Sequence, residues 1–299
     1  MNRYILIGLI AFLSFGASAQ SKQQSYPSEN AAVEAFVDAL ASSDEEAMAK
    51  VLGSDWRKFI PPQDRENVYA FLAAWSQGHR VVNQGPDRAI LEVGTEGWTL
   101  PVPMVKRAAG WQFDTPAGAE EMRTRRIGRN ELSAMQASLA YFDAQKEYAR
   151  VDRDGDGVLQ YAQNLISSRG TRDGLYWPSQ AGEAESPLGP LIATRKPGEG
   201  YHGYRYKILK GQGKDAPGGA YDYVIKGRMV SGFALIARPV RYGDTGVMSF
   251  IVSHDGQVYE KDLGPNSESI AAGLAVFNPD ASWKKVDVPP PGASKSTSK

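Results

Sequence analysis

The chain has 299 residues, no cysteine, and 34 Lys and Arg residues against 34 Asp and Glu residues. The absence of cysteine excludes disulfides, thiolate chemistry and cysteine-ligated zinc. The balanced charge gives no reason to expect a nucleic acid or an anionic membrane as a partner. The three histidines, His79, His202 and His254, are too far apart for HxH or HxxxH spacing, so a histidine-rich metal centre is not expected. With 42% hydrophobic and 23% charged residues, the chain has the composition of one large or two ordinary globular domains.

The first 19 residues have the pattern of a secretory signal peptide. A short positive segment, Met1 to Arg3, precedes an apolar run from Tyr4 to Phe15, and Ala17-Ser18-Ala19 fits a small-x-small cleavage site. The apolar run is too short to span a bilayer. We therefore expect cleavage before Gln20 and a periplasmic or secreted protein without a transmembrane anchor.

Residues 20–27 are a polar leader, and residues 28–115 are predicted to form a small α+β domain. Apolar periodicity predicts helices over 29–41, 44–52 and 64–77, with Ser28 and Ser43 as N-caps of the first two. Strands are predicted over 88–93, 97–106 and 110–113, with a break or an edge at Pro101 and Pro103. Helices followed by a meander suggest an NTF2-like or cystatin-like fold. Trp98 and Trp111 could then line a small-molecule pocket or belong to the core, and His79 is expected to cap a helix.

Residues 116–288 are predicted to form a second domain, a long helix packed on an antiparallel sheet. The helix should cover 116–151, with a break at Gly128 and Asn130 as the cap of its second part. A short helical turn is expected around 161–166, followed by an irregular stretch over 167–203. The predicted strands are 204–209, 221–225, 232–237, 247–253 and 257–261. Asp255-Gly256 suggests a type I′ hairpin, and residues 289–299 read as a disordered tail.

The segment "DRDGDG" at 152–157 matches the start of an EF-hand calcium loop. Such a loop takes oxygen ligands at positions 1, 3, 5, 7, 9 and 12 and a glycine at position 6, which here is Gly157. The corresponding ligands are Asp152, Asp154, Asp156, the Val158 carbonyl, Gln160 and Gln163. Because Gln163 replaces the usual bidentate glutamate, a Ca²⁺ ion would bind weakly and serve a structural role. The alternative is a polar turn after the helix, in which the aspartates form Asx turns.

Two aromatic segments could line a binding groove. "DGLYWP" contains Tyr176 and Trp177, and "YHGYRY" contains Tyr201, His202, Tyr204 and Tyr206. Flat aromatic side chains can stack on a glycan or a peptide. The alternative is that these side chains anchor a long loop onto the sheet.

The sequence contains no GxSxG, HExxH or Walker motif. We therefore expect an exported, non-enzymatic protein that binds an envelope protein or polymer or acts as an accessory of the envelope. Two alternatives remain open. One is a hydrolase that acts on envelope polymers near residues 173–206, and the other is a small-molecule binder that uses the N-terminal domain.

Two resemblances extend this interpretation. The order of helix, acidic loop and meander over roughly 129–264 resembles the globular heads of type IV pilins and pseudopilins, although here the helix follows a separate domain. A closer resemblance is to domain of unknown function 2950, carried by the phrases "RRIGRNEL", "DRDGDG", "DGLYWP", "SPLGP", "YHGYRYKIL", "GRMVSGFALIARP" and "KDLGP". That resemblance implies an exported bacterial protein and brings no catalytic residues with it.

Overall fold

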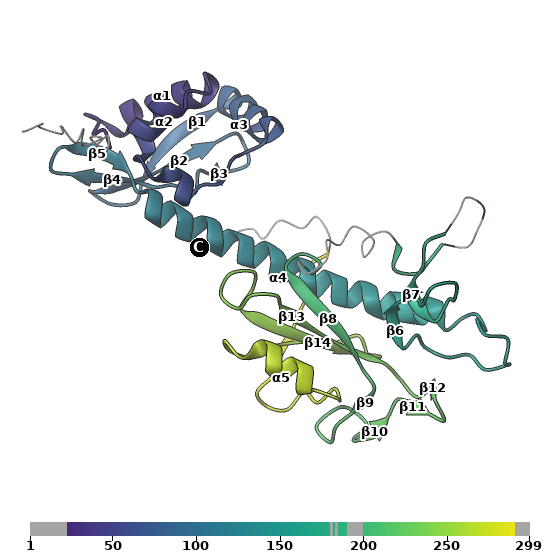
Figure 1. Ribbon diagram of the computed structural model, residues 1–299. Helices are drawn as coiled ribbons and strands as arrows, with labels where there is room; N and C mark the ends of the chain where they lie inside the picture. The colour runs from purple at the N-terminus through teal and green to yellow at the C-terminus, as the bar shows by residue number, and fades with distance from the viewer. Residues whose placement is uncertain (1–22, 180–181, 183–184, 190–199, 291–299) are drawn as a thin grey trace, which may run out of the picture. The chain divides into compact units, whose positions relative to one another are not determined.

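The computed structural model describes residues 23–179, 182, 185–189 and 200–290. The predicted signal peptide and residues 291–299 of the predicted tail lie outside this part of the chain. The fold belongs to the predicted α+β class, and it divides into two compact units, residues 1–122 and 123–299 (Figure 1). Among the described helices, none has the length and apolar character needed to cross a membrane.

The N-terminal unit begins with helices whose first turns are held by capping side chains. Its helices are α1 (Glu29–Ala41), α2 (Glu45–Leu52), the 3-10 turn η1 (Trp56–Lys58) and α3 (Arg65–Gln77). Ser28 accepts the backbone N–H of Ala31 at 3.2 Å, as predicted for the cap of α1. Asp44, rather than the predicted Ser43, caps α2, and its carboxylate accepts two backbone N–H groups at 3.0 Å.

A meander packs against these helices. Its strands are β1 (His79–Asn83), β2 (Arg88–Val93), β3 (Trp98–Thr99), β4 (Met104–Arg107) and β5 (Gly110–Phe113), in the order β1-β2-β4-β5 with β3 also paired to β2. The predicted strand over 97–106 is interrupted between β3 and β4, where Pro101 and Pro103 lie. Tyr26, which the sequence places in the polar leader, is 7% exposed and pairs with Trp111 beside β5.

The positions of Trp98, Trp111 and His79 can be compared with the roles predicted for them from the sequence. Trp111 is 5% exposed and belongs to the core, whereas Trp98 is 47% exposed, so it neither lines an interior cavity nor belongs to the core. His79 begins β1, a strand that the sequence did not predict. Its Nδ1 lies 3.2 Å from the carbonyl oxygen of Trp75, which agrees with the expected capping of the preceding helix.

Helix α4 (Thr115–Tyr148) is one continuous helix of 34 residues, so the predicted break at Gly128 is wrong. A single glycine costs a helix only about 1 kcal/mol relative to alanine, which is too little to end it. Asn130 is not an N-cap. Its side-chain amide instead donates to the carbonyl of Thr245 at 2.9 Å within the C-terminal unit.

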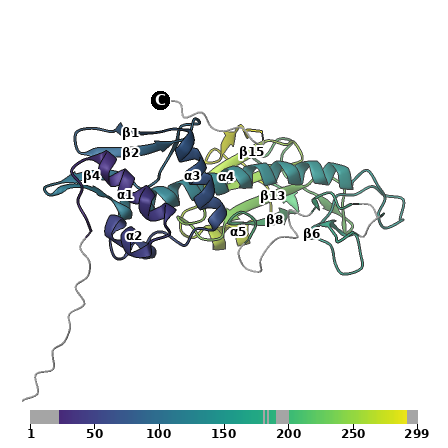
Figure 2. The ribbon, with the colours of Figure 1, turned by 90° about the horizontal axis from the view of Figure 1, so that it is seen from above.

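The C-terminal unit is built on the predicted antiparallel sheet. The sheet consists of β8 (Tyr204–Leu209), β13 (Ala234–Pro239), β14 (Met248–Ser253), β15 (Val258–Asp262) and β16 (Lys284–Val286), in the order β16-β15-β14-β13-β8. The part of α4 after Met122 lies along one face, and α5 (Ser267–Gly273) lies against the other (Figures 1 and 2). Lys207 on β8 donates to the carbonyl of Ala272 at the end of α5 at 2.6 Å. Neither α5 nor β16 was predicted.

Six short strands lie outside this sheet in the described part of the C-terminal unit. They are β6 (Asn164–Ile166), β7 (Gly174–Tyr176), β9 (Gly211–Gln212), β10 (Tyr221–Asp222), β11 (Val224–Ile225) and β12 (Arg228–Met229). The pairs are β6 with β7, which is parallel, β9 with β10, and β11 with β12. The predicted strand over 221–225 is therefore split at Tyr223.

The predicted helical turn around 161–166 is wrong. The side chain of Gln145 on α4 accepts the N–H of Ala162 and donates to its carbonyl, both at 2.8 Å. Tyr161 donates its N–H to the carbonyl of Met229. Because these backbone groups bond outside the segment, they cannot form the bonds of a helical turn, and the segment leads into β6.

The hairpin between β14 and β15 forms, but its turn is not type I′. The strands pair as far as Val252 and Val258, which leaves five residues between them. A type I′ turn needs positive φ at both central residues. Gly256 has a φ of 80°, whereas Asp255 is not among the residues with positive φ. Asp255 instead accepts the hydroxyl of Ser253 at 2.6 Å.

Gly246 and Tyr204 meet in the core of the C-terminal unit. Tyr204 is 0% exposed, and its hydroxyl donates to the carbonyl of Met248 at 2.8 Å. A Cβ atom at position 246 would overlap the hydroxyl and ring of Tyr204. Only glycine therefore fits beside this tyrosine.

Candidate functional site at the end of helix α4

The acidic loop, residues 152–157, follows the end of α4. Asp152 accepts the backbone N–H groups of Gly155 and Gly157, both at 2.8 Å. The N–H of Gly157 contributes most to lowering the pKa of Asp152 below its usual range, because it stabilises the charged carboxylate. Both glycines have positive φ, 74° and 82°, which allows the chain to turn around the carboxylate.

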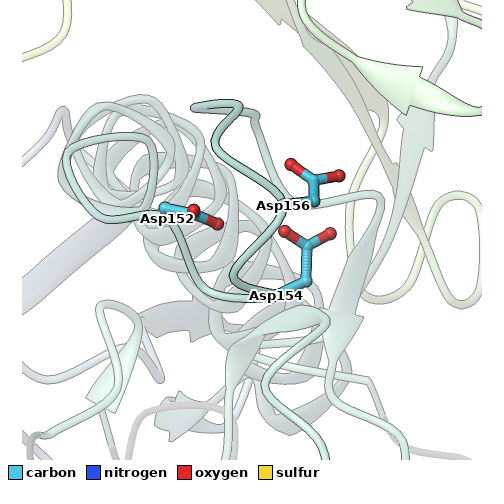
Figure 3. A group of neighbouring side chains, drawn as sticks. All are labelled: Asp152, Asp154 and Asp156. Carbon is cyan, nitrogen blue, oxygen red and sulfur yellow. The ribbon is translucent and has the colours of Figure 1, made fainter.

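The carboxylates of Asp152, Asp154 and Asp156 gather on this loop, and one oxygen of each lies within 4.8 Å of the others (Figure 3). Oxygen ligands of this kind suit a hard cation such as Ca²⁺. Each of the three already has a partner, which for Asp152 is the pair of N–H groups of Gly155 and Gly157. Asp154 accepts the side-chain amide of Gln160 at 2.7 Å, and Asp156 forms an ion pair with Arg228.

The other predicted ligands fit a calcium sphere less well. The side-chain amide of Gln163 donates a hydrogen bond to the carbonyl of Gly227 at 2.7 Å and accepts one from the ammonium group of Lys210 at 3.4 Å. Both ends of this amide are therefore bonded to groups other than the three carboxylates. Val158 donates its N–H to Asp156 at 2.9 Å. The element after the loop is strand β6 and not the second helix of an EF-hand. The three aspartates therefore fit a cation, whereas positions 9 and 12 would have to rearrange.

A pocket of about 800 Å³ opens beside the loop. The residues that line it come from the end of α4, the acidic loop, the segment that leads into β6, the turn before β7, the position between β8 and β9, and the β11–β12 hairpin. Its lining is Tyr148, Arg153, Asp154, Gln160, Tyr161, Gln163, Asn164, Gly170, Thr171, Arg172, Asp173, Lys210, Gly227 and Arg228. Three predicted calcium ligands, Asp154, Gln160 and Gln163, thus belong to its wall.

The sequence prediction missed the four basic residues of this wall, Arg153, Arg172, Lys210 and Arg228. Two signals were present in the quoted motifs, because Arg153 is the second residue of "DRDGDG" and Arg172 directly precedes "DGLYWP". The contribution of Lys210 and Arg228 depends on long-range pairing, which no local motif reports.

Trp177, a predicted groove residue, lies under two of these cations. The guanidinium of Arg153 lies 5.0 Å from the centre of its ring and that of Arg172 lies 5.5 Å away. The ring is only 4% exposed, so it supports the guanidinium groups more than it offers a stacking face. Burial is the main cause that lowers the pKa of Arg153, and the charge of Arg172 lowers it further.

Asp173 organises the turn before β7. Its carboxylate accepts the hydroxyl of Thr171 at 2.7 Å and both the N–H and the hydroxyl of Ser168. The bond from Thr171 contributes most to lowering the pKa of Asp173 below its usual range. Asp173 is therefore a carboxylate near neutral pH, and both of its oxygens already accept hydrogen bonds from neighbouring residues.

The remaining groove candidates behave differently. Tyr201 packs on His202 with ring centres 4.2 Å apart and on Tyr206 at 6.5 Å, so these three form a cluster at the start of β8. Tyr204 is fully buried, and Tyr176 is half-buried on β7. The hydroxyl of Tyr206 is buried without a hydrogen-bond partner in the described part of the chain, and burial raises its pKa. Of the six candidates, Trp177 lies against two residues of the pocket wall, Arg153 and Arg172.

Comparison with known proteins extends these observations. A family model described as "Protein of unknown function (DUF2950)" matches residues 23–286. No curated protein and no solved structure matches the chain. The match covers the described core of both units and the acidic loop, and the chain belongs to the DUF2950 family of proteins of unknown function.

Proposed function

We propose that the protein is an exported binding protein of the bacterial envelope that takes a polar ligand into the pocket at the end of α4. The observation that carries this proposal is the pocket itself. Its volume of about 800 Å³ lies within the range of ligand sites, and hydrogen-bonding and charged side chains converge on it. Export rests on the signal-peptide pattern of residues 1–19.

The state of Asp173 does not suit it to act as the general acid of a hydrolase. A general acid needs a carboxyl group that keeps its proton near neutral pH. The hydrogen bonds to Asp173 shift its pKa in the opposite direction. Asn164 and Thr171 add hydrogen-bonding groups of the kind that hold the hydroxyl or amide groups of an envelope polymer.

The acidic loop adds a second element to the proposal. A weakly bound Ca²⁺ at Asp152, Asp154 and Asp156 would hold the pocket wall in place, because Arg153 and Asp154 belong to both the loop and the wall. We expect millimolar Ca²⁺ to raise the melting temperature of the mature protein and a chelator to reverse the effect. Asp154→Ala should abolish the shift. An unchanged melting temperature at millimolar Ca²⁺ removes the calcium element and leaves the pocket proposal standing.

The pocket can be tested by filling it without changing its charge. Asn164 is an exposed residue of β6 in the pocket lining, and Asn164→Trp places a large neutral side chain there. Ile166 lies on the same strand, is 44% exposed and does not line the pocket, so Ile166→Trp is the matched control.

The measurement is binding of the mature protein to an array of neutral and acidic oligosaccharides and soluble peptidoglycan fragments. We expect at least one class to bind, and Asn164→Trp to weaken it roughly tenfold or more, which corresponds to about 1.4 kcal/mol. Ile166→Trp should bind as the wild type does. Equal binding by the two variants would show that the ligand does not enter this pocket.

A further inference from the structure

The charged residues of the pocket wall are unequal in number. Four are basic, namely Arg153, Arg172, Lys210 and Arg228, and two are acidic, Asp154 and Asp173. The chain as a whole is neutral, with 34 residues of each sign. Among the side chains of the wall itself, basic groups therefore outnumber acidic ones, and basic groups can attract and orient an anion.

The charged groups of the wall differ in their partners. Arg228 is paired with Asp156 of the acidic loop. The two carboxylates of the wall already accept hydrogen bonds from neutral groups. Asp154 accepts one from the amide of Gln160, and Asp173 accepts hydrogen bonds from the hydroxyl groups of Thr171 and Ser168. Lys210 has only the neutral amide oxygen of Gln163 at 3.4 Å.

Of the three arginines of the wall, Arg153 and Arg172 lack an ion-pair partner among the described residues, whereas Arg228 has one. Neither forms an ion pair with any residue that the structure describes. Both guanidinium groups nevertheless lie within 5.5 Å of the centre of the same tryptophan ring. Arg172 is exposed, so an anion can reach the pair from solvent. Arg153 is half-buried, so an anion that binds there loses part of its own hydration shell.

Tyr148, the last residue of α4, contacts both arginines. Tyr148 donates its hydroxyl to the carbonyl of Arg172 at 2.7 Å, and the guanidinium of Arg153 lies over the ring of the same tyrosine at 4.7 Å. Nε of Arg153 donates to the carbonyl of Tyr148 at 3.3 Å, which leaves its terminal nitrogens for a ligand. Two guanidinium groups held in this way can each donate a pair of N–H groups to a carboxylate or a phosphate.

We propose that the pocket binds its ligand through an oxyanion, a carboxylate or a phosphate, held between Arg153 and Arg172. This inference rests on the proposed binding function and names the chemical class of the ligand. A pocket of about 800 Å³ is larger than a free phosphate ion needs, so it has room for an oxyanion that is one group of a larger molecule. That molecule is a small soluble acid or an acidic unit of an envelope polymer.

The test is calorimetric titration of the full mature chain with inorganic phosphate, citrate, galacturonate and polygalacturonate. At least one of these probes should bind at low salt. Binding should weaken as NaCl rises from about 0.01 to about 1 M, where the screening length falls from ~30 to ~3 Å. Equal affinity per site for galacturonate and its polymer indicates a small acid as the natural ligand, and tighter binding of the polymer indicates a polymer chain. Both results support the oxyanion.

Two variants test the arginine pair. Arg172→Gln removes the exposed cation, and Arg153→Gln with Arg172→Gln removes both. Each should weaken binding at least tenfold. Arg169→Gln is the matched control, because Arg169 is exposed in the same turn, carries the same charge and does not line the pocket. Should Arg153→Gln lower the melting temperature, the single Arg172→Gln variant alone still decides the question.

A variant of opposite sign completes the test. Asp154→Asn removes a negative charge from the wall, so it should strengthen the binding of an acidic probe while it weakens any binding of Ca²⁺. The inference is overturned if no acidic probe binds, or if Arg169→Gln weakens binding as much as Arg172→Gln. In either case a neutral oligosaccharide whose binding is lost in Asn164→Trp would still uphold the proposed binding function.

Discussion

The two units bury different kinds of side chain. The core of the N-terminal unit is almost entirely apolar, with Leu91, Met104 and Phe113 among its most buried members. The C-terminal unit also buries polar groups, among them Gln145, and several of the bonds that these groups make hold backbone groups. The side chain of Gln145 donates a hydrogen bond to the carbonyl of Ala162, which lies two residues before β6. The hydroxyl of Tyr148 donates one to the carbonyl of Arg172. Apolar side chains pack by shape, whereas a buried hydrogen bond fixes the position of a particular backbone group. The pocket lies in the C-terminal unit, where such bonds hold parts of its wall.

The largest expected effect is on the apolar core. Phe113 is 2% exposed and its ring centre lies 5.5 Å from that of Phe36. Phe113→Ala should lower the free energy of unfolding by about 3–5 kcal/mol, because it removes a large buried side chain and leaves a cavity. Urea denaturation measures the change. Phe59→Ala is the control, since Phe59 is 39% exposed and its loss should cost only about 0.5 kcal/mol. Similar losses in both variants would contradict the assignment of this core.

A smaller effect is expected from the buried amide. Gln145→Leu keeps the approximate size of the side chain but leaves the N–H and the carbonyl of Ala162 without their partner. The expected loss of unfolding free energy is about 2–4 kcal/mol, since each buried group left unsatisfied costs ~1–3 kcal/mol. Ligand binding should weaken as well, because Gln163 and Asn164 follow Ala162.

The control for this variant is Gln136→Leu. Gln136 is also on α4, but it is half-buried and makes a single bond of 3.3 Å, to the carbonyl of Pro289. Its substitution should change stability by less than about 1 kcal/mol. If Gln145→Leu proves as mild as the control, the buried hydrogen bonds do not position the pocket, and the contrast between the units fails.

The smallest effect is the pH dependence of the acidic loop. The pKa of Asp152 is lowered from 3.8 in the folded protein, so its stabilising contribution is present above that value and is lost as the pH falls through the folded-state pKa. Melting temperatures measured between about pH 6 and pH 2 should therefore fall less steeply for Asp152→Asn than for the wild type. Asp143→Asn, on the exposed surface of α4, is the control for the change in net charge. Identical acid limbs for wild type and Asp152→Asn would contradict the role given to the N–H groups of Gly155 and Gly157.

Local chemistry made much of the fold predictable. The helices α1 to α3 follow from apolar periodicity and from caps that act within three residues, as Ser28 does. The bounds of β2, β5 and β8 match the predicted strands because alternation and flanking turns define them. The prediction failed where distant residues decide the conformation. Ala162 forms no helix because Gln145 takes its backbone bonds, and β16 exists only through pairing with β15.

The candidate site was predictable to the same limited extent. The aspartates at 152, 154 and 156 were found because their spacing is local, and they do come together. The residues that complete the pocket come from segments up to 80 positions apart, since Tyr148 and Arg228 line one pocket. Spacing within a motif cannot report such a meeting. The aromatic prediction likewise located Trp177 but not the two arginines that lie over it.

The contact between Gly246 and Tyr204 has an evolutionary consequence. Because a Cβ atom at 246 would overlap the tyrosine, neither position can change freely while the other keeps its residue. Among members of the family the two should covary, with larger residues at 246 found only where the tyrosine is replaced by a smaller side chain. The pair then serves as a marker of correct alignment between sequences too divergent to align by their loops.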